Sequence, residues 1–562
     1  MSLSHSRWNL CPPVPEAILT AAPDLPPFIV QLLYNRGITE LADLPAFLAA
    51  DRSLSADPFR LPDMDRAVGR LYRALLSGET MAVYGDYDVD GVTGTALLVK
   101  GLTALGGKVI PYIPHRLTEG YGLKVAALEK LKRQGASLVI TVDCGITAIA
   151  EAQKARRLGL DMVITDHHTP LADLPVATAV VNPKLPGSAY PCRELAGVGV
   201  ALKLVQAILI SMGREDELEG LMDLAALGTV ADMVPLLGEN RYLVKRGLER
   251  LNTVPRAGIR EIMAQNGLEG GSLNPETISW VIAPRLNTAD RLAHAITSYN
   301  LLMTDSADEA GALARWLEGK NTERQNLTAE VFARSRQQII ARGIAPILVA
   351  SDGDYPGGVI GIVASRIAEE FYRPAIIVRR GERFSSGSCR SIPEFNITLA
   401  LNQCRHLLSQ FGGHARAAGF TLPTANLADL EQALLELATR ALDGLDLRPQ
   451  LDIDTEVRLP ELNGRVLATL QQLAPFGQGN PLPTFLSRGV EVADCRTMGG
   501  TGKHLRLKLR QGGTIWEAVA FGWGSCLAEV SPRLDIVYNL EVDRWRGEER
   551  LRLNLLDFAP LN

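Results

Sequence analysis

Cysteine is scarce in this chain of 562 residues, which contains seven cysteines and no pair with C-x-x-C spacing. An odd number of scattered thiols argues against a disulfide framework and against a zinc site built from cysteines. No apolar run in the sequence reaches the roughly 18 residues that a membrane-spanning helix requires. The first residues, MSLSHSRWNLCPPVP, also lack the basic and then apolar pattern of a secretory signal. We therefore expect a cytoplasmic protein that does not associate with a membrane.

An excess of positive charge is absent as well. The formal net charge is -5, so any binding of nucleic acid must use local basic patches. Hydrophobic residues make up 46% of the chain and charged residues 22%, which is the balance of a folded globular protein. At typical domain sizes, this length corresponds to about three or four domains.

Residues 81–95, MAVYGDYDVDGVTGT, combine an apolar run with three carboxylates. The pattern predicts a buried parallel strand and a glycine turn into a helix. It places Asp86, Asp88 and Asp90 at the carboxyl end of the strand, where open α/β sheets bind ligands. Three acids so close together repel one another, so a pocket that holds them requires a counter-charge such as a divalent metal. For this stretch taken alone, a solvated acidic turn is the alternative.

Later segments of the predicted sheet also end in potential metal ligands. Apolar runs before Asp143 and before Asp166, His167 and His168 predict parallel strands whose carboxyl ends share one edge of the sheet. Asp232 is the single acid of the apolar helical stretch LAALGTVADMVPL, where an unpaired charge is costly. A ligand role removes that cost, so the four stretches together favour a metal site over a coincidence of strand-end acids.

The residue types indicate which metals fit. Carboxylate oxygens with imidazoles and no thiolate suit Mn²⁺ or Mg²⁺ better than a structural zinc ion. The acids outnumber what one hydrolytic ion needs, whereas two ions about 4 Å apart can clamp a phosphate and activate an attacking water. The sequence therefore predicts a centre for two ions.

Four motifs, DYDVDG, VDCG, DHH and GTVADMVP, resemble those of the DHH phosphoesterase superfamily. Within it, the chain is similar to the RecJ family of bacterial exonucleases from about residue 55 to the end. That similarity extends through NPKLPGSAYPCRELAGVGVALKL, APRLNTADRL, GGVIGIVASR and FGGHARAAGF. The resemblance implies an exonuclease that hydrolyses single-stranded DNA from the 5′ end to 5′-mononucleotides, in DNA repair and recombination.

The resemblance also implies roles for the motif residues. Two ions of Mn²⁺ or Mg²⁺ are expected on Asp86, Asp88, Asp90, Asp143, His167 and Asp232. Asp143 is expected to bridge the ions, and the glycine turn favours Asp88 and Asp90 over Asp86 as direct ligands. Asp166 is a candidate for supporting the ligands from behind. His168 is placed near the scissile phosphate, where an imidazole can hydrogen-bond to the developing charge, although a histidine that merely packs would fit the same pattern.

Further residues are expected to contact the strand. Arg116 follows a predicted strand end, where a guanidinium can fork onto a phosphate, although a surface arginine is the alternative there. Ser388 and Arg390 alternate with small residues on one strand face, and His414 follows two glycines that permit close approach of a ligand. With these, similarity to the family gives the substrate-binding set Arg116, Arg285, Asn287, Ser388, Arg390 and His414. In APRLNTADRL, Arg291 could meet the nucleotide backbone together with Arg285 and Asn287.

Two segments depart from the family's pattern. Family members commonly read NAAGRL where this chain has NTADRL, so Thr288 and Asp290 differ within an expected phosphate contact. Many relatives read WHPG before VIGIVASR, and here Pro356 stands where they have histidine. We assign no role to that position.

The predicted fold class is α/β with a C-terminal β-barrel. Residues 1–75 form a supporting segment, and residues 76–304 form the DHH catalytic domain with its parallel sheet. Residues 305–342 are expected to form a connecting helix, and 343–447 a second α/β unit, the DHH-associated domain. Residues 448–562 are expected to form an OB-fold domain that binds nucleic acid.

The OB segment contains the strand pattern KHLRLKLR. Period-two alternation places its leucines on one face and His504, Arg506, Lys508 and Arg510 on the other. A basic face on a small barrel is a common way to bind a single strand, with aromatic side chains for stacking. Lysine and arginine also protect edge strands from aggregation, so both interpretations stay open. The aromatic candidates, at the surface or in the core, are Trp516, Phe521, Trp523 and Trp545.

Two other functions remain possible on the sequence. One is a phosphoesterase for small substrates such as oligonucleotides, cyclic dinucleotides or pyrophosphate. Many of those enzymes carry a histidine four residues before their D-x-D pair, where this chain has Tyr84. The other is a non-catalytic DNA-binding scaffold, which would be expected to lose its metal acids. For the exonuclease, the expected partner is single-stranded DNA, a helicase and a single-strand-binding protein are candidate partners, and the chain is expected to be a monomer.

Overall fold

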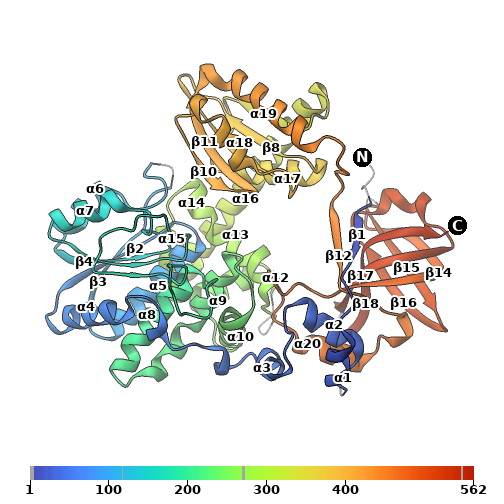
Figure 1. Ribbon diagram of the computed structural model, residues 1–562, viewed down its shortest axis with the longest axis horizontal. Helices are drawn as coiled ribbons and strands as arrows, with labels where there is room; N and C mark the ends of the chain where they lie inside the picture. Colours follow the sequence, from blue (N-terminus) through green and yellow to red (C-terminus); the bar gives the residue numbers. More distant parts are fainter. Residues whose placement is uncertain are drawn as a thin grey trace.

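The computed structural model describes residues 5–23, 25–116, 118–268, 272–500, 502–545 and 548–561. Within these ranges, the side chains of residues 41, 465, 543–545, 548 and 549 are not described. Two α/β domains and a β-barrel make up the fold, and a long helix joins the two α/β domains (Figure 1). None of the described helices is both long and apolar enough to cross a membrane.

The first domain is built on a parallel sheet. In the described residues its order is β3-β2-β4-β5-β6. The strands are β2 (Thr80–Gly85), β3 (Lys108–Tyr112), β4 (Ala136–Val142), β5 (Asp161–Thr165) and β6 (Ala179–Val181). Each neighbouring pair is parallel, so all the carboxyl ends lie along one edge. That edge is where the motif acids follow their strands.

Helices cover both faces of this sheet, which explains why its strands read as continuous apolar runs. Met81 and Val83 of β2 pack in one core cluster, and Ala82 and Tyr84 pack in the other. The first cluster holds residues of α4 (Met64–Leu76), α5 (Val89–Ala104), α8 (Gly197–Ser211) and α9 (Met222–Ala231). The second cluster holds residues of α6 (Val125–Arg133) and α7 (Ile149–Arg157).

Further helices complete the first domain and lead to the second. They are α10 (Gly238–Thr253), α11 (Ala257–Gln265), α12 (Pro275–Thr277), α13 (Ala283–Leu286), α14 (Thr288–Leu292) and α15 (Ile296–Met303). The long helix α16 (Ala307–Arg342) then begins at Ser306, whose hydroxyl accepts the Glu309 N–H at 3.3 Å. The expected connecting helix is thus present.

The second domain has a mixed sheet, in the order β10-β11-β9-β8-β7 among the described residues. Its strands are β7 (Leu348–Asp352), β8 (Ala375–Arg379), β9 (Phe384–Arg390), β10 (Gln410–His414) and β11 (Ala417–Pro423). Its helices are α17 (Ile360–Phe371), α18 (Ile397–Gln403) and α19 (Leu427–Leu442). β7 and β8 are parallel, and the other neighbouring pairs are antiparallel.

The C-terminal strands close into a barrel. In the described part of the chain, pairing runs β14-β15-β16-β18-β17, and β17 pairs again with β14. The strands are β14 (Thr484–Met498), β15 (His504–Gln511), β16 (Thr514–Ala520), β17 (Arg533–Trp545) and β18 (Glu548–Leu561). They follow β12 (Gln450–Ile453), β13 (Thr455–Glu456) and α20 (Gly464–Gln472). The predicted α/β class with a C-terminal barrel is confirmed.

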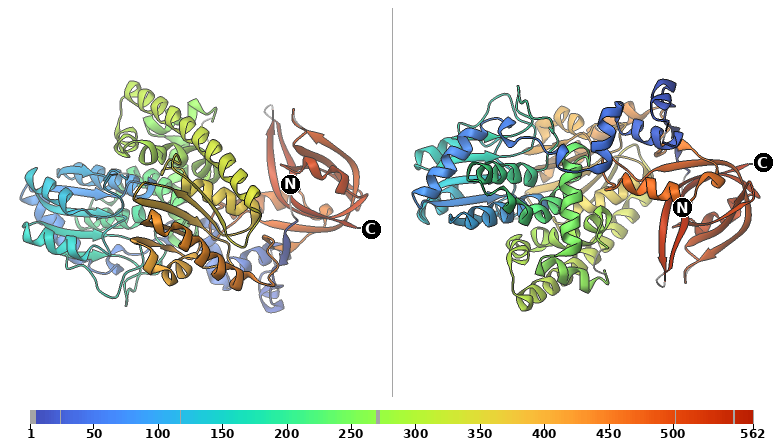
Figure 2. Two further views of the ribbon diagram at one scale, coloured as in Figure 1. Left: turned by 90° about the horizontal axis from the view of Figure 1, so that it is seen from above. Right: turned by 90° about the horizontal axis from the view of Figure 1, so that it is seen from below.

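The N-terminal segment joins the barrel to the first domain (Figure 2). Its elements are β1 (Arg7–Leu10), α1 (Glu16–Ala21), α2 (Pro27–Asn35) and α3 (Leu44–Ala49). β1 pairs in parallel with β12, and Ile29 and Phe47 pack into the barrel's core cluster. Buried Arg241 of α10 donates to the carbonyls of Phe47 at 2.8 Å and Leu473 at 2.7 Å. These contacts fix the barrel against the first domain.

Candidate active site

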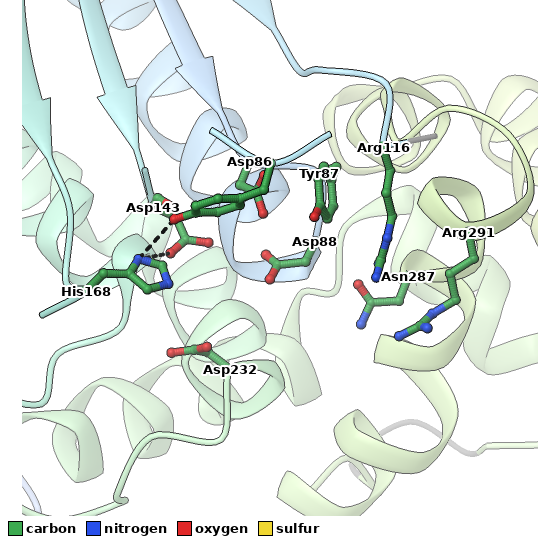
Figure 3. Close-up of a pocket in the computed structure, with 10 residues that line it drawn as sticks. Asp86, Tyr87, Asp88, Arg116, Asp143, His168, Asp232, Asn287 and Arg291 are labelled. Carbon is green, nitrogen blue, oxygen red and sulfur yellow. Dashed lines mark hydrogen bonds and ion pairs between the residues drawn. The ribbon is translucent and has the colours of Figure 1, made fainter. Parts of the chain in front are cut away.

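The strand ends of the first sheet bring carboxylates and imidazoles together (Figure 3). Asp86 and Asp88 follow β2, and Asp88 caps α5 by accepting the Gly91 N–H at 3.0 Å. Asp90, in the first turn of α5, accepts the N–H groups of Gly197 at 2.6 Å and Val198 at 2.8 Å. The N-terminus of α8 therefore orients the Asp90 carboxylate.

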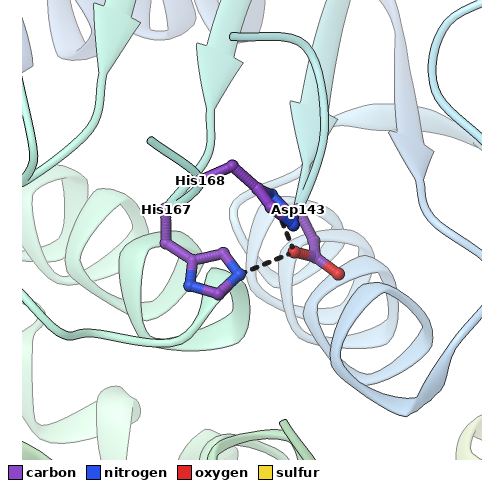
Figure 4. Close-up of side chains that lie close together, drawn as sticks. All are labelled: Asp143, His167 and His168. Atoms are coloured by element: carbon purple, nitrogen blue, oxygen red, sulfur yellow. Dashed lines mark ion pairs between the residues drawn. The ribbon is translucent and has the colours of Figure 1, made fainter. Parts of the chain in front are cut away.

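Asp143 and His167 form the centre of this cluster (Figure 4). Asp143 follows β4 with φ 58°, a left-handed conformation that aspartate tolerates better than most residues. Its Oδ1 lies 3.0 Å from Nε2 of His167. That nitrogen also lies 3.8 Å from Oδ2 of Asp90 and 3.7 Å from Oδ2 of Asp232, which ends α9.

The potential ligand atoms of the cluster include two neighbouring groups of three residues each. Carboxylate oxygens of Asp86, Asp88 and Asp143 lie within 4.8 Å of one another, as do ligand atoms of Asp90, His167 and Asp232. Asp143 belongs to the first of these groups and contacts His167 of the other. It therefore lies between two places where a cation would find several ligands.

The cluster is electrostatically unfavourable without a cation. Burial, together with the charge of Asp88, raises the pKa of Asp90 to about 7. Burial and the charges of Asp90 and Asp88 raise the pKa of Asp232 to about 9. Burial also raises the pKa of Asp143, and neighbouring carboxylates add to the rise. For His167, burial and the neighbouring His168 lower the pKa to about 3, so this imidazole is neutral.

Buried atoms of the cluster lack partners. Among the described residues, Oδ1 of Asp86, Oδ1 of Asp143 and both ring nitrogens of His167 are buried without a hydrogen bond. Such atoms are costly unless a ligand satisfies them, and oxygens with a neutral imidazole are donors that Mn²⁺ and Mg²⁺ accept. The residues present therefore fit a pair of divalent cations.

Asp166 supports the two histidines from behind. Its Oδ1 accepts the backbone N–H of His167 at 2.7 Å and pairs with Nδ1 of His168 at 2.8 Å. Its Oδ2 accepts the N–H of Ile146 at 2.9 Å. Burial alone would raise the pKa of Asp166, but the hydrogen bonds from His168 and the backbone outweigh it and lower the pKa. This carboxylate is thus occupied in orienting the turn that carries the histidines.

A cavity of about 330 Å³ opens in front of the cluster. Arginines and an amide from the segments after β3 and around α14 lie opposite the acids (Figure 3). The lining residues are Asp86, Tyr87, Asp88, Arg116, Tyr121, Asp143, His168, Asp232, Asn287 and Arg291. An acidic wall and a basic wall thus face one another, an arrangement suited to a phosphate bound to cations.

Two lining residues were not anticipated from the sequence. The Arg116 guanidinium lies over the Tyr87 ring, with Cζ 5.0 Å from the ring centroid. The Tyr121 hydroxyl lies 3.3 Å from the carbonyl of Asp143 and 3.3 Å from Nδ1 of His168. Signals were available: Tyr87 lies between two motif acids, and Tyr121 follows a glycine soon after Arg116.

The second domain contributes further basic charge beside this cavity. Ser388 and Arg390 lie on the same face of β9, with Oγ and Nη1 3.4 Å apart. Burial lowers the pKa of Arg390, and the nearby charge of Arg116 acts in the same direction. Arg291 reaches across to the carbonyl of Gly358 at 3.3 Å. Arginines of both domains therefore gather at the domain junction.

Comparisons with known proteins agree with this architecture. Residues 80–229 match the DHH family, N-terminal domain, 343–442 the DHHA1 domain, and 453–557 the RecJ OB domain. The single-stranded-DNA-specific exonuclease RecJ of Bacillus subtilis is 37% identical over 100% of this chain and 71% of its own length. The chain belongs to the RecJ family.

Solved RecJ structures match the fold. RecJ of Thermus thermophilus in complex with Mn²⁺ superimposes with a TM-score of 0.85 at 32% identity, over 99% of this chain and 80% of that one. Its complex with Mg²⁺ gives a TM-score of 0.79. A further RecJ bound to manganese is 38% identical over 69% of this chain and 98% of its own, with a TM-score of 0.60.

Of the six expected substrate contacts, Arg116 and Asn287 line the cavity, whereas Ser388, Arg390, Arg285 and His414 are absent from its lining. Arg285 donates to Glu318 of α16, to Asn266 and to the Val281 carbonyl at 2.8 Å, so its donors are occupied within the fold. His414 is exposed at the end of β10 and is absent from the cavity lining. Asn287 does reach the cavity, and its Oδ1 accepts the Val89 N–H at 3.0 Å.

The residues that depart from the family pattern lie in different surroundings. Thr288 is buried and donates to the Pro284 carbonyl at 2.7 Å. Asp290 is buried and pairs with Arg116. Tyr355, before Pro356, is buried in the second domain, with its hydroxyl 3.1 Å from Oγ of Ser335. Of these positions, Asp290 places a negative charge against Arg116 of the cavity wall.

The basic face of the RecJ OB domain is partly neutralised. The leucines of β15 are buried and the alternate residues are at least partly exposed. Neighbouring strands place Glu517 2.8 Å from Arg506 and Glu491 3.9 Å from Arg510. Pairing across strands, which the sequence of β15 alone does not reveal, brings these acids to the face. The side chain of Lys508 is exposed to solvent.

The aromatic candidates divide between core and surface. Trp516 and Trp523 are buried in the barrel, whereas Phe521 is 47% exposed. Phe521 packs edge-on against His504, with ring centroids 5.4 Å apart. His504 itself accepts the Gly522 N–H at 2.9 Å. The side chain of Trp545 lies outside the described residues.

Proposed function

We propose that this chain is a metal-dependent exonuclease that hydrolyses single-stranded DNA from the 5′ end and releases 5′-mononucleotides. One observation carries the proposal. Within a chain that matches RecJ exonucleases along its length, a metal-ligand cluster with unsatisfied atoms faces arginines across one cavity. The opposed walls suit a phosphodiester bound between cations and guanidinium groups.

The ligand groups suggest how two cations would be held. Mn²⁺ or Mg²⁺ would lie on Asp90, His167, Asp232 and Asp143, and on Asp86, Asp88 and the same Asp143. When bound, such a pair supplies charge neutralisation at the phosphate and an activated water nucleophile. Asp143 is proposed as the shared ligand because it lies between the two groups.

His168 is proposed to act on the phosphate. Asp166 holds its Nδ1 at 2.8 Å, which directs the remaining edge of the ring to the cavity (Figure 3). Burial opposes protonation, but the hydrogen bond and charge of Asp166 outweigh it and raise the pKa of His168. A ring that retains its proton can donate to a phosphate oxygen as negative charge develops there.

The basic wall is proposed to bind the strand end. Arg116, Asn287 and Arg291 line the cavity, and Ser388 and Arg390 lie beside them on the second domain. Guanidinium groups recognise phosphates through forked hydrogen bonds, so these residues would position the terminal nucleotide against the metal cluster. Positioning of the end explains exonucleolytic rather than internal cleavage.

The OB barrel is proposed to hold the strand beyond the active site. Lys508 and Phe521 are exposed there and offer charge and a stacking surface, and Arg510, 3.9 Å from Glu491, adds partly neutralised charge. A helicase and a single-strand-binding protein are proposed as partners that supply the strand. We further propose that the chain acts as a monomer in the cytoplasm.

The decisive experiment compares strand ends. A single strand labelled at its 5′ or its 3′ end is digested with Mn²⁺, and release of the label is followed over time. Early release of 5′ label as a mononucleotide is expected; inactivity, or early release of the 3′ label alone, contradicts the proposal. Comparable turnover of a dinucleotide and a long strand would favour a small-substrate enzyme. Against that rival, Tyr84 is buried and donates to the Gly122 carbonyl at 3.1 Å, away from the cavity lining.

A further inference from the structure

A buried carboxylate, itself outside the cavity lining, is bonded to an arginine of the basic wall. Asp290 is 1% exposed, and its Oδ2 accepts a hydrogen bond from Arg116. Its Oδ1 is also buried and has no hydrogen-bond partner among the described residues. A half-satisfied buried carboxylate costs stability, so its presence beside a substrate cavity calls for an explanation in terms of what binds there.

Two arginines, Arg116 and Arg291, act electrostatically on Asp290. Burial raises its pKa, and the charges of Arg116 and Arg291 oppose the rise. Arg390 is near enough to Arg291 to lower the pKa of that group, although burial is the larger cause. The two α/β domains approach each other closely here: a Cβ on Gly358 of the second domain would lie 2.5 Å from the carbonyl oxygen of Arg291 in the first. Asp290 is therefore hydrogen-bonded to one guanidinium, that of Arg116, and lies within electrostatic reach of a second, that of Arg291.

A ligand in the cavity can replace Asp290 as the hydrogen-bond partner of Arg116. Arg116 lines the cavity, lies over the Tyr87 ring and is paired on one side by Asp290. A terminal phosphate carries a charge of about -1.5 to -2 at neutral pH and offers three oxygens to the same guanidinium. Phosphate and Asp290 therefore compete for Arg116, and the carboxylate also repels the phosphate.

We propose that Asp290 is a specificity-determining residue that weakens the hold of the arginine cluster on a 5′-terminal phosphate. It keeps Arg116 in place when no strand is bound, and it yields Arg116 to the phosphate of an entering strand. Its negative charge limits the affinity for that phosphate, and with it the retention of the released 5′-mononucleotide. This inference rests on the proposed function, because it takes the strand's 5′ phosphate as the ligand of the basic wall.

The test uses the full chain with Asp290→Asn, which removes the charge and keeps an oxygen for Arg116. The probes are dAMP, which carries the phosphate, and deoxyadenosine, which does not. Each is added as an inhibitor of Mn²⁺-dependent digestion of a 5′-phosphorylated strand. We expect the inhibition constant of dAMP to fall about tenfold in the variant, with a lower KM for the phosphorylated strand and no matching change for deoxyadenosine.

The same substitution in an Arg116→Gln background provides the matched control. Because Asp290 acts on phosphate partly through Arg116, its removal should change dAMP inhibition much less when Arg116 is absent. An additive effect in the double variant would overturn the exchange of Arg116 between carboxylate and phosphate. Unchanged dAMP inhibition in Asp290→Asn, or equal changes for dAMP and deoxyadenosine, would overturn the inference as a whole. Asp290→Gly serves as a second variant if Asp290→Asn does not fold.

Failure of the proposed function is separable from failure of this inference. Binding of dAMP to the metal-free chain is measured directly in EDTA by calorimetry. If the wild type does not digest strands from the 5′ end but Asp290→Asn still binds dAMP about tenfold more tightly, the specificity role stands and the exonuclease proposal falls. If digestion proceeds from the 5′ end and dAMP binding is equal in both proteins, the specificity role falls alone.

Discussion

Nε2 of His167 lies 3.0 Å from Oδ1 of Asp143, and in the described part of the chain neither atom makes a hydrogen bond. Because burial lowers the pKa of His167 to about 3, the imidazole carries no positive charge at neutral pH. A neutral ring nitrogen and a buried carboxylate oxygen then face one another at contact distance without a hydrogen bond among the described residues. A cation bound by both atoms would remove this unfavourable contact, as expected if the two residues are ligands of one metal site.

The first prediction removes the carboxylate charge at the centre of the cluster. Asp143→Asn should lower Mn²⁺-dependent hydrolysis at least about a hundredfold, because it weakens a ligand shared by both cation positions. Binding of single-stranded DNA should persist, since the basic residues are untouched. Asp354→Asn, at an exposed carboxylate of the second domain, is the control and should remain active. Wild-type hydrolysis by Asp143→Asn would refute the ligand assignment.

The second prediction concerns pH and metal removal. Folding raises the pKa of Asp90 to about 7 and of Asp232 to about 9, so the native state holds protons that the unfolded state releases. Stability of the metal-free protein should therefore fall as the pH rises through these values. Below pH 6.5, the lowered pKa of His167 works in the opposite direction, so the decline should be clearest between pH 7 and 9.

Thermal melting in EDTA at pH 7 and pH 9, with and without Mn²⁺, measures this effect. Mn²⁺ at a hundred times its dissociation constant should stabilise the folded protein by about 2.7 kcal/mol and so raise its melting temperature. It should also reduce the dependence of the melting temperature on pH. If the metal-free protein melted at the same temperature at pH 7 and pH 9, the raised pKa values of Asp90 and Asp232 would be contradicted.

The candidate ligands could be predicted to lie together because each acid stands at a predictable structural position, and the structure brings them within reach of one another. Strand ends of a parallel sheet meet at one edge, so Asp86, Asp143 and His167 could be placed together before their distances were known. The fold class followed from the same alternation of apolar runs and helices. Asp166 was also placed behind the ligands, where the structure shows it binding the turn that carries both histidines.

Residues outside the motifs were harder to place because their partners are distant in sequence. Arg285 stands in a family segment, yet Glu318, thirty-three residues later, occupies its guanidinium. Arg506 reads as free charge on its strand until pairing of β15 with β16 brings Glu517 beside it. Electrostatic compensation of this kind depends on which elements pack together, and single-sequence periodicity does not contain that information.

The third prediction addresses the proposed end-binding residues. Arg390→Ala should raise KM for 5′-phosphorylated strands about tenfold or more, because it removes a guanidinium beside Arg116, and it should affect 5′-hydroxyl strands less. Release of the first nucleotide from matched phosphorylated and unphosphorylated strands measures the difference. Arg440→Ala, at an exposed arginine of α19, is the control. Equal losses on both strands would count against a phosphate contact.

The fourth prediction compares Lys508, for which no ion pair is found among the described residues although Asp494 and Glu517 stand opposite it in the strand register, with Arg506, which is paired. Lys508→Ala should weaken binding of a long single strand and reduce the slope of log affinity against log salt by about 0.7, the value for one lost phosphate contact. Arg506→Ala should change both quantities less, because Arg506 already pairs with Glu517 at 2.8 Å. Fluorescence anisotropy with a labelled strand at several salt concentrations provides both numbers. A larger effect at Arg506 would contradict this view of the face.

The fifth prediction tests how α8 is packed against the cluster. A Cβ on Gly197 would lie 2.7 Å from Cβ of Asp143 and 2.9 Å from Oδ2 of Asp90, closer than such atoms can approach. Gly197→Ala should therefore displace both carboxylates and raise the Mn²⁺ concentration for half-maximal hydrolysis about tenfold or more.

Gly319→Ala provides the matched control for this change. It lies within α16, where a Cβ would meet nothing within 4 Å, and alanine there should stabilise the helix by about 0.5–1 kcal/mol. Hydrolysis by this variant should need no more Mn²⁺ than the wild type. Titration of both variants with Mn²⁺ makes the comparison, and an unchanged requirement in Gly197→Ala would mean that the N-terminus of α8 does not set the position of Asp90 and Asp143. In that case the hydrogen bond from the Gly197 N–H to Asp90, 2.6 Å long, would be a packing contact without influence on the metal cluster.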